Sequence, residues 1–583
     1  MTVEHRAKSV NSEHRAKGFQ STQSAEVLVV GAGPVGLALA GDLAWRGHSV
    51  ILLEKSDGSI FQPKMDLVGI RTMEFCRKWG IVDDVEATAY DREYPQDNVY
   101  LTTLKGHELG RQPMPSMNAE LPPPESPQKR ERCPQNFFDP VLQKFASAQA
   151  GLVTCHQTEL IEFVQSADAV SSTVKDLKTG EMRTVVTPYL VACDGGKSAV
   201  RESLGIEMKG RGLLTYTTNV IFKCANFNAL HDKAPGYRYM FVGPTGTWAT
   251  IVAINGRDHW RMSIIGNALE KTNYTHDELK ALAHRAMGAP FEMEILSVLP
   301  WQRAELVAES YGQGRVFLCG DACHLTSPTG GLGMNTGIGD AVDLSWKLGA
   351  VLSGYAGPAL LNSYFVERQP IAKRITQFST GNLETLKKVP SSAKIEEEGP
   401  EGDRVRLAVG EALCEGLKRE WFSLNMHLGN RYTNSPINVY DEVESAEDQD
   451  IEFNDAVHYR PSSRVGARAP HVWLGDNTST LDWLGRDFVL FCFASATPRI
   501  DRVVRAAKQR EIPLQVREIH HAGAKALYEK AFVLIRPDGH VAWRGDDGPP
   551  SEQAVQDLWL TVCGLTDEKE SASNRSSISG MHS

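Results

Sequence analysis

The hydrophobic pattern near the start of the chain predicts a strand, a glycine-rich turn and a helix in direct succession. Residues 26–30 (EVLVV) form a short β-branched run, typical of a strand buried on both faces of a parallel sheet. The sequence GAGPVGLALAGDLAWRGH follows, and a second apolar run at 49–53 ends at Glu54. This order predicts a β-α-β unit whose first turn is made of glycines.

The glycine spacing in this turn is typical of dinucleotide binding. Gly31, Gly33 and Gly36 occupy the positions of GxGxxG. The first allows a tight turn, the second lets a pyrophosphate approach the backbone, and the third lets the helix pack closely on the sheet. Glu54, about 20 residues further on, favours a ribose with a free 2′-hydroxyl, and therefore FAD or NAD rather than NADP. The residues expected to contact the dinucleotide here are Gly31, Gly33, Pro34, Val35, Gly36, Glu54 and Lys55.

Two later apolar runs also end in a glycine and an aspartate. Residues 189–193 lead into Asp194-Gly195, with Arg201 seven residues beyond the aspartate. Alone, this pattern is more typical of an ordinary strand-to-helix turn with a capping aspartate. Residues 316–319 lead into Gly320-Asp321, a Pro/Gly-rich loop and a helix from about Met334. The positive end of that helix would favour negative charge on a bound group.

Composition limits the class of protein. A chain of 583 residues predicts two or three domains, and a formal charge of −10 with a pI near 6.0 gives no basic surface for nucleic acid or anionic membranes. No apolar run approaches the roughly 20 residues of a membrane helix. Ten cysteines without a CxxC pair favour a reduced, cytoplasmic protein. Residues 1–24, which contain EHRAK twice, and 567–583 are expected to be disordered.

The order GxGxxG, Asp-Gly, Gly-Asp resembles that of the single-component FAD-dependent aromatic hydroxylases, the group that includes para-hydroxybenzoate hydroxylase. Residues 63–81 (PKMDLVGIRTMEFCRKWGI) and 362–374 (NSYFVERQPIAKR) resemble two further segments of this family. The branch of 3-(3-hydroxyphenyl)propionate hydroxylase and the polyketide hydroxylases is the most similar. The resemblance covers residues 25–375, with a weaker likeness after about 455.

The resemblance implies FAD as cofactor and NADH or NADPH as co-substrate. It places Arg71 at the FAD pyrophosphate, Gln135 beside the flavin, Asp321 at the ribityl chain and Pro328 beside the ring. Lys64 stands where the family usually has arginine. It also implies a transient nicotinamide site to which Asp194 and Arg201 contribute. The cofactor contacts expected in the later segments are Arg71, Gln135, Asp194, Arg201, Gly320, Asp321, Pro328, Gly331, Gly333, Met334 and Asn335.

The expected fold is α/β: a discontinuous Rossmann-like FAD domain, an inserted antiparallel-sheet substrate domain, and a thioredoxin-like domain without CxxC. The FAD domain is assigned to 25–85, 130–206 and 301–380, and the substrate domain to 86–129 and 207–300. A helical connector (381–455) and the thioredoxin-like domain (456–566) follow. Tyr237, Arg238, Tyr239 and His259 are candidates for the substrate pocket, although sheet packing or solvent exposure is favoured over a catalytic role for each of them. An arginine could hold a substrate carboxylate, but Arg238, Arg257 and Arg261 cannot be ranked from the sequence.

The function that the resemblance implies is hydroxylation of a phenol, ortho or para to an existing hydroxyl, with NAD(P)H and O₂ through a flavin C4a-hydroperoxide. No metal is required, the base that deprotonates the phenol is not identifiable, and a homodimer is an open alternative to a monomer. A reductase or a halogenase on the same fold is the main alternative, although the halogenase motif WxWxIP is absent. A catalytically silent flavoprotein that acts as a binding module is a more distant one.

Overall fold

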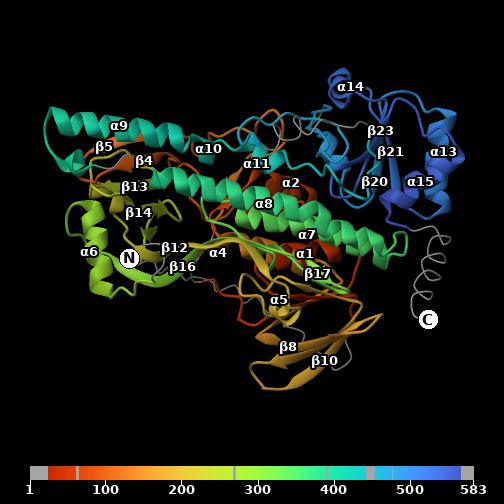
Figure 1. The fold of residues 1–583 in the computed structure, drawn as a ribbon, viewed down its shortest axis with the longest axis horizontal. Coiled ribbons are helices and arrows are strands. Elements are labelled where there is room, and N and C mark those ends of the chain that lie inside the picture. Colours follow the sequence, from red (N-terminus) through yellow and green to blue (C-terminus); the bar gives the residue numbers. More distant parts are fainter. Residues whose placement is uncertain are drawn as a thin grey trace, which may run out of the picture.

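The structure is a computed structural model that describes residues 24–60, 63, 65–266, 271–388, 392–441, 454–475 and 477–565. Lys64 and, apart from Ser24, the two tails expected to be disordered lie outside these residues. The described chain has a mixed α/β fold with sheets of six, eight, four, three and two strands (Figure 1). The predicted fold class is confirmed.

The six-stranded sheet forms the base of the nucleotide-binding part. Its strand order is β17-β18-β11-β1-β2-β7, and β1 pairs in parallel with both β11 and β2. The carboxyl ends of these strands therefore meet at one edge, where Gly31, Glu54 and Cys193 lie. The strands are β1 (Val27–Val30), β2 (Val50–Glu54), β7 (Leu152–His156), β11 (Tyr189–Ala192), β17 (Gly312–Gln313) and β18 (Val316–Leu318).

Apolar helices pack on this sheet and bury its strands on both faces. Leu28 and Leu52 are completely buried in one core with Leu39 of the first helix. Helix α1 (Pro34–Trp45) packs against α4 (Gln135–Ser147) and α7 (Gly333–Leu352), and α7 packs against the long helix α8 (Ala359–Lys387). Shorter helices surround the strand ends: α2 (Ile70–Trp79), α3 (Val82–Glu86), α5 (Ala199–Ser203) and the 3-10 turn η2 (Gly320–Ala322).

The eight-stranded sheet lies beside the nucleotide-binding part, in the order β19-β16-β12-β15-β14-β13-β4-β5. All its neighbouring pairs are antiparallel except β4 and β13, so the sheet is mixed rather than wholly antiparallel as expected. A parallel pair needs a long connection, and more than a hundred residues separate these two strands. The strands are β4 (Asn98–Leu101), β5 (Glu108–Gln112), β12 (Met208–Lys223), β13 (Arg238–Gly243), β14 (Gly246–Ala253), β15 (His259–Ile265), β16 (Glu294–Ala308) and β19 (His324–Leu325).

Smaller elements complete the main body. A three-stranded sheet that the sequence did not predict projects at one side (Figure 1). It contains β8 (Thr158–Gln165), β9 (Val170–Asp176) and β10 (Met182–Thr187), and a two-stranded pair joins β3 (Leu67–Val68) to β6 (Glu131–Arg132). The remaining helices are η1 (Phe227–Ala229), α6 (His276–Met287), η3 (Ala393–Glu396), α9 (Pro400–Gly416), α10 (Lys418–Trp421) and α11 (Leu424–Leu428).

The C-terminal part has a sheet of its own, in the order β21-β20-β22-β23. Strands β20 and β21 are parallel, whereas β20-β22 and β22-β23 are antiparallel, as expected for a thioredoxin-like unit. Trp346 of α7 and Leu360 of α8 share its apolar core, so it packs directly on the end of these two helices (Figure 1). Its elements are η4 (Thr480–Trp483), β20 (Phe488–Cys492), α13 (Pro498–Gln509), β21 (Leu514–Glu518), α14 (Ala522–Tyr528), β22 (Phe532–Ile535), β23 (Val541–Gly545) and α15 (Glu552–Val562).

Candidate active site

The three glycines after β1 have different surroundings. Gly31 has a φ of +99°, and a Cβ there would lie 2.5 Å from the carbonyl oxygen of Cys193. A Cβ on Gly36 would lie 1.8 Å from the carbonyl oxygen of Gly31, whereas a Cβ on Gly33 would meet no atom within 4 Å in the part of the chain that the structure describes. Gly31 and Gly36 therefore make the tight turn possible, and Gly33 is the glycine that faces open space.

Glu54 fixes this turn from the next strand. Its carboxylate accepts hydrogen bonds from the backbone N–H of Ala32 (2.9 Å) and of Ser56 (2.7 Å). Burial alone would raise the pKa of Glu54, but these two N–H groups outweigh burial and hold its pKa below the ordinary value. The carboxylate is thus ionised at neutral pH, and each oxygen keeps a lone pair for a ribose hydroxyl.

The Gly-Asp turn and the start of α7 form the opposite side of the same edge. Gly320 has a φ of +66° and packs against Val35, which brings Asp321 next to the glycine turn. The loop through Pro328 ends at α7, whose N-cap, Leu332, makes no side-chain capping bond. The first N–H groups of α7 are therefore open to a ligand, and the helix dipole adds positive potential there.

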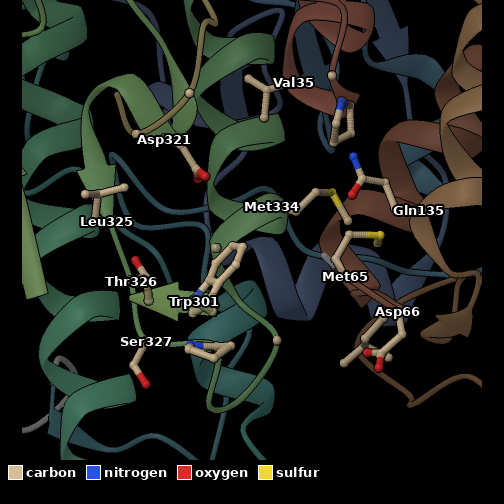
Figure 2. A pocket seen from close by; sticks show the side chains of 18 of the residues that line it. Val35, Met65, Asp66, Gln135, Trp301, Asp321, Leu325, Thr326, Ser327 and Met334 are labelled. Carbon is tan, nitrogen blue, oxygen red and sulfur yellow. The ribbon is translucent and has the colours of Figure 1, made fainter. Parts of the chain in front are cut away.

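A cavity of about 1560 Å³ runs from the glycine turn to the eight-stranded sheet. In Figure 2, Asp321, Leu325, Thr326 and Ser327 lie on one side of it, and Met65, Asp66, Gln135 and Met334 lie on the other. The predicted site residues that line it are Gly31, Gly33, Pro34, Val35, Glu54, Lys55, Gln135, Asp194, Arg238, Asp321, Pro328, Gly331, Gly333 and Met334.

The structure places Arg71 outside the cavity, against the C-terminal sheet, and its expected contact with a pyrophosphate stays a prediction. Its guanidinium donates to Glu74 (2.8 Å) and to the carbonyl oxygen of Asp538 (2.8 Å), and it lies over the ring of Phe75. Arg71 does not line the cavity, because these groups hold it against the C-terminal sheet.

Arg201 and Asn335, both expected to contact the cofactor, make contacts within the protein. Arg201 is buried and donates to the carbonyl oxygens of Gly196 and Ala322, both at 3.2 Å, which ties the Asp-Gly turn to the Gly-Asp turn. The Asn335 amide accepts from Gly69 and donates to the Gly331 carbonyl, so it joins α2 to the loop before α7. Neither side chain lines the cavity, although both shape its walls.

Three of the four proposed pocket residues lie outside the cavity. Tyr237 and Tyr239 are completely buried in the sheet and its packing. The hydroxyl of Tyr237 donates to Asp66, and that of Tyr239 accepts from the N–H of Gly236. His259 is paired with its neighbour Asp258 (2.6 Å). Only Arg238 faces the cavity, because β13 turns alternate side chains to opposite faces. Gly36 and Gly320 do not line the cavity. They lie behind its wall, where Gly36 packs against Gly31 and Gly320 packs against Val35.

A group of charged residues meets at the sheet end of the cavity. Sequence reasoning named Arg238 and Arg261 of this group but missed Asp66, Arg132 and Glu420. Arg132 and Arg261 both pair with Asp66, at 3.3 and 3.0 Å. Burial would raise the pKa of Asp66, but the two guanidiniums lower it to about 2. Glu420 of α10 bonds both Arg238 (3.3 Å) and the N–H of Gly330 (3.1 Å). No motif marks these positions, since four segments far apart in sequence meet here.

The residues at the nucleotide end fit FAD. Gly33 offers open backbone for a pyrophosphate, Glu54 is an ionised acceptor for ribose hydroxyls, and the start of α7 offers free N–H groups. In addition, Oδ1 of Asp194 is buried without a hydrogen-bond partner among the described residues. An unpartnered carboxylate oxygen at this edge is a place for a donor from a bound molecule. Fold and site together define a dinucleotide-binding flavoprotein with an adjoining substrate cavity.

Comparisons with known proteins agree with this class. A family described as FAD binding domain matches residues 24–379, and one described as aromatic-ring hydroxylase, C-terminal, matches residues 462–565. The rebeccamycin biosynthetic enzyme RebC with reduced flavin is 36% identical, with a TM-score of 0.85 over 93% of this chain and 99% of that one. The 4-methyl-5-nitrocatechol 5-monooxygenase of Burkholderia sp. is 30% identical over 92% of this chain and 97% of its own length.

A structure of aklavinone-11 hydroxylase with FAD and aklavinone is 26% identical, with a TM-score of 0.78 over 94% of this chain and all of that one. The chain belongs to the family of FAD-binding aromatic-ring hydroxylases. It is an FAD-dependent monooxygenase, and the predictions of cofactor and reaction type are confirmed. Among the described residues, no helix combines the length and apolar character needed to cross a bilayer.

Proposed function

We propose that this chain hydroxylates a phenolic aromatic compound held between the start of α7 and the eight-stranded sheet. The observation that carries the proposal is the continuity of one cavity from Gly33 and Asp321 to Arg238 and Trp301. A dinucleotide laid along the glycine turn would bring its reactive ring to the middle of this cavity, and an aromatic ring would fit beyond it. The relatives include a phenol 2-monooxygenase and a 2,4-dichlorophenol 6-monooxygenase.

When bound, FAD supplies the activation of dioxygen by its reduced ring, which NADH or NADPH provides with electrons. The chain positions the reacting groups and supplies the electrostatic potential around them. Backbone N–H groups of Gly333 and Met334 favour the negative charge that a reduced flavin ring carries. Glu420 accepts hydrogen bonds from the N–H of Gly330 and from Arg238. One side chain therefore connects the loop before α7 to the sheet end of the cavity.

Apolar and aromatic residues exclude water from the middle of the cavity. Met65 and Met334 lie on one side, and Trp301 and Leu325 lie across from them (Figure 2). Excluding water matters because a reactive oxygen donor decays by hydrolysis or uncoupled release when solvent reaches it. The cavity is thus suited to oxygen transfer rather than to simple electron transfer, which favours a hydroxylase over a reductase.

The proposal is tested with purified protein and a panel of phenols. The protein should bind FAD, oxidise NADH or NADPH slowly, and do so at least about 10-fold faster with a phenol that is converted to a product containing one additional oxygen. Mass spectrometry under ¹⁸O₂ would show the source of that oxygen. Stimulated oxidation that yields only hydrogen peroxide for every phenol, or a halogenated product, would contradict the proposal.

The cellular compartment of the protein is inferred from the redox state of its cysteines. All ten are free, and seven of them are buried. Unpaired cysteines persist where glutathione and thioredoxin keep thiols reduced, so we infer a cytoplasmic protein. Burial raises the pKa of Cys492 to about 11, which makes its thiol unreactive in the C-terminal unit. The homodimer stays a prediction, and mass photometry of the purified protein would test it.

A further inference from the structure

We propose that strand β10 pairs with β10 of a second copy of this chain, so that the three-stranded sheets of two molecules form one continuous sheet. The strand is the outermost one in the order β10-β9-β8, and no strand among the described residues pairs with its outer edge. The sheet projects from the main body (Figure 1), and no residue of β10 lines the cavity. The inference therefore does not depend on the proposed function.

The outer edge of β10 presents main-chain groups to a further strand. The N–H of Asp176 donates to the carbonyl oxygen of Glu181 (2.9 Å), and the register of β9 and β10 then continues without a shift. Because main-chain groups alternate in direction along an antiparallel strand, Met182, Thr184 and Val186 turn their N–H and C=O groups away from β9. An edge of this kind is a template for another strand.

Strand β10 lacks the features that usually protect an edge from pairing. Its sequence, MRTVVT, contains no proline and no lysine, and no register shift marks a bulge between β9 and β10. Its one charged residue, Arg183, donates to both carboxylate oxygens of Glu181, at 2.9 and 2.6 Å. The charge on the strand is thus matched within the same molecule and does not repel a second copy.

The solvent-facing side of this sheet has apolar residues at its edges. Met182 and Val186 of β10 are 50% and 54% exposed. Val164 of β8 lies in the same row as Val186, with Ser171 of β9 between them, and is 71% exposed. Such positions are usually polar when one face of an antiparallel sheet meets water. The apolar edge therefore agrees with a strand that is covered in solution.

The strand is complementary to itself about Thr184. In an antiparallel pairing centred there, Thr184 meets Thr184 of the second copy, and Met182 meets Val186. The three outward-facing residues then all fall in hydrogen-bonded pairs, which gives about six main-chain hydrogen bonds. On the other face Arg183 lies opposite Val185, so no like charges stand directly opposite each other. A pairing centred on Met182 or Val186 would leave part of the edge without a partner.

The length of β10 limits the strength of the dimer. A strand of 6 residues spans about 20 Å, and a sheet is about 10 Å thick. The paired edges therefore cover far less than the roughly 800 Å² per partner of a standard stable interface. We expect a reversible dimer with a dissociation constant of about 1–100 μM.

Sedimentation equilibrium of the FAD-loaded protein tests the dimer itself. Between about 1 and 100 μM, the range of the expected dissociation constant, the average mass should rise from that of one chain toward that of two. A protein that remains monomeric at the highest concentration would overturn the inference.

Position 184 distinguishes this interface from any other, because it would pair with itself across the two-fold axis. Thr184→Lys and Thr184→Glu should each weaken the dimer at least about 10-fold, since like charges would stand directly opposite each other. An equal mixture of the two variants should dimerise again, since a lysine would then face a glutamate. A dimer that is unchanged in Thr184→Lys, or a mixture that stays monomeric, would show that the axis does not pass through Thr184.

The matched control is Thr173→Lys. Thr173 of β9 lies directly opposite Thr184 on the same face, but its two copies would be three strand spacings apart, about 14 Å. Salt screens charges beyond a Debye length of about 8 Å, so this variant should dimerise like the wild type. An unchanged flavin spectrum and melting temperature show that each variant is folded. If Thr173→Lys weakens the dimer as much as Thr184→Lys, the proposed pairing is wrong.

Discussion

At the scale of single residues, open space rather than contact distinguishes the cofactor site. Gly31 and Gly36 are glycines because their neighbours leave no room for a Cβ, whereas no described residue lies within 4 Å of a Cβ built on Gly33. Gly33 has an ordinary φ of −70°, so any residue could adopt its backbone conformation. The reason for glycine at this position must therefore be a bound molecule.

This difference predicts opposite behaviour for two substitutions. Gly33→Val should leave thermal stability of the FAD-free protein nearly unchanged and weaken FAD binding at least about 10-fold, because the side chain would occupy the path of the pyrophosphate. Gly36→Ala should instead reduce the amount of folded protein, because its Cβ would overlap the Gly31 carbonyl oxygen. Fluorescence titration of FAD and thermal unfolding measure the two effects. Unweakened FAD binding in Gly33→Val would contradict this assignment of the site.

At the scale of elements, Asp42 connects three helices around the nucleotide sheet. This completely buried carboxylate of α1 accepts hydrogen bonds from Arg46 (2.8 Å), from the indole of Trp79 on α2 (2.7 Å) and from Ser345 on α7 (2.5 Å). Burial would raise the pKa of Asp42, but Arg46 and Lys78 outweigh it and hold its pKa far below the ordinary value. The glycine turn begins the same helix, so this contact also fixes the turn relative to α7.

We expect Asp42→Asn to lower the free energy of unfolding by about 3 kcal/mol, because Arg46 and Lys78 would lose their buried counter-charge. The matched control is Asp84→Asn, which removes a carboxylate from a surface pair with Lys144 at 2.7 Å. A surface pair contributes less than about 1 kcal/mol. Urea unfolding of both variants tests the comparison, and equal effects would show that Asp42 does not hold these helices together.

At the scale of the whole molecule, buried ion pairs join the C-terminal sheet to the rest of the chain. Arg468 pairs with Glu74 of α2, and its Nε lies 2.9 Å from the carboxylate. Arg536 of the C-terminal part bonds Glu367 of α8 at 2.5 Å, and all four side chains are buried. The C-terminal unit is thus fixed to the helices that form the cofactor site, which supports a structural role for it.

The Glu74 pair predicts a dependence of stability on pH. Burial would raise the pKa of Glu74, but Arg468 and Arg71 lower it to about 2, against an ordinary 4.5. A carboxyl with a lowered pKa contributes stability that is complete above pH 4.5 and is lost as pH falls from 4.5 through 2. The melting temperature of the wild type should therefore exceed that of Glu74→Gln at pH 7, and the gap should narrow between pH 4.5 and 3.

A control separates this pair from other contacts between the same elements. Arg77→Gln removes a half-exposed pair that also joins α2 to the C-terminal part, where Arg77 lies 2.6 Å from Asp482. It should lower stability by less than about 1 kcal/mol. A gap between wild type and Glu74→Gln that stays constant from pH 7 to pH 3 would contradict the assignment.

How much the sequence could predict depends on whether neighbours in the chain are neighbours in space. The glycine turn, Glu54 and the start of α7 were predicted because a strand, its turn and the next helix are local features with a periodic pattern. The sequence could not show that Arg71 bonds the carbonyl oxygen of Asp538, because 467 residues separate the two. Likewise, Tyr237 and Arg238 are adjacent in the sequence, and only the three-dimensional structure shows that Arg238 lines the cavity whereas Tyr237 does not.

The sequence alone determined the position of the nucleotide turn, since this follows from short motifs whose physics is local. The same motifs carry the family resemblance that implied the fold class and FAD as the cofactor. The tertiary structure alone decided which charged residues line the sheet end of the cavity. Arg303, Asp66 and Glu420 belong to segments that come together only after the two large sheets and α10 are packed. Coulomb interactions in the cavity depend on those distances through space, and no local pattern in the sequence encodes them.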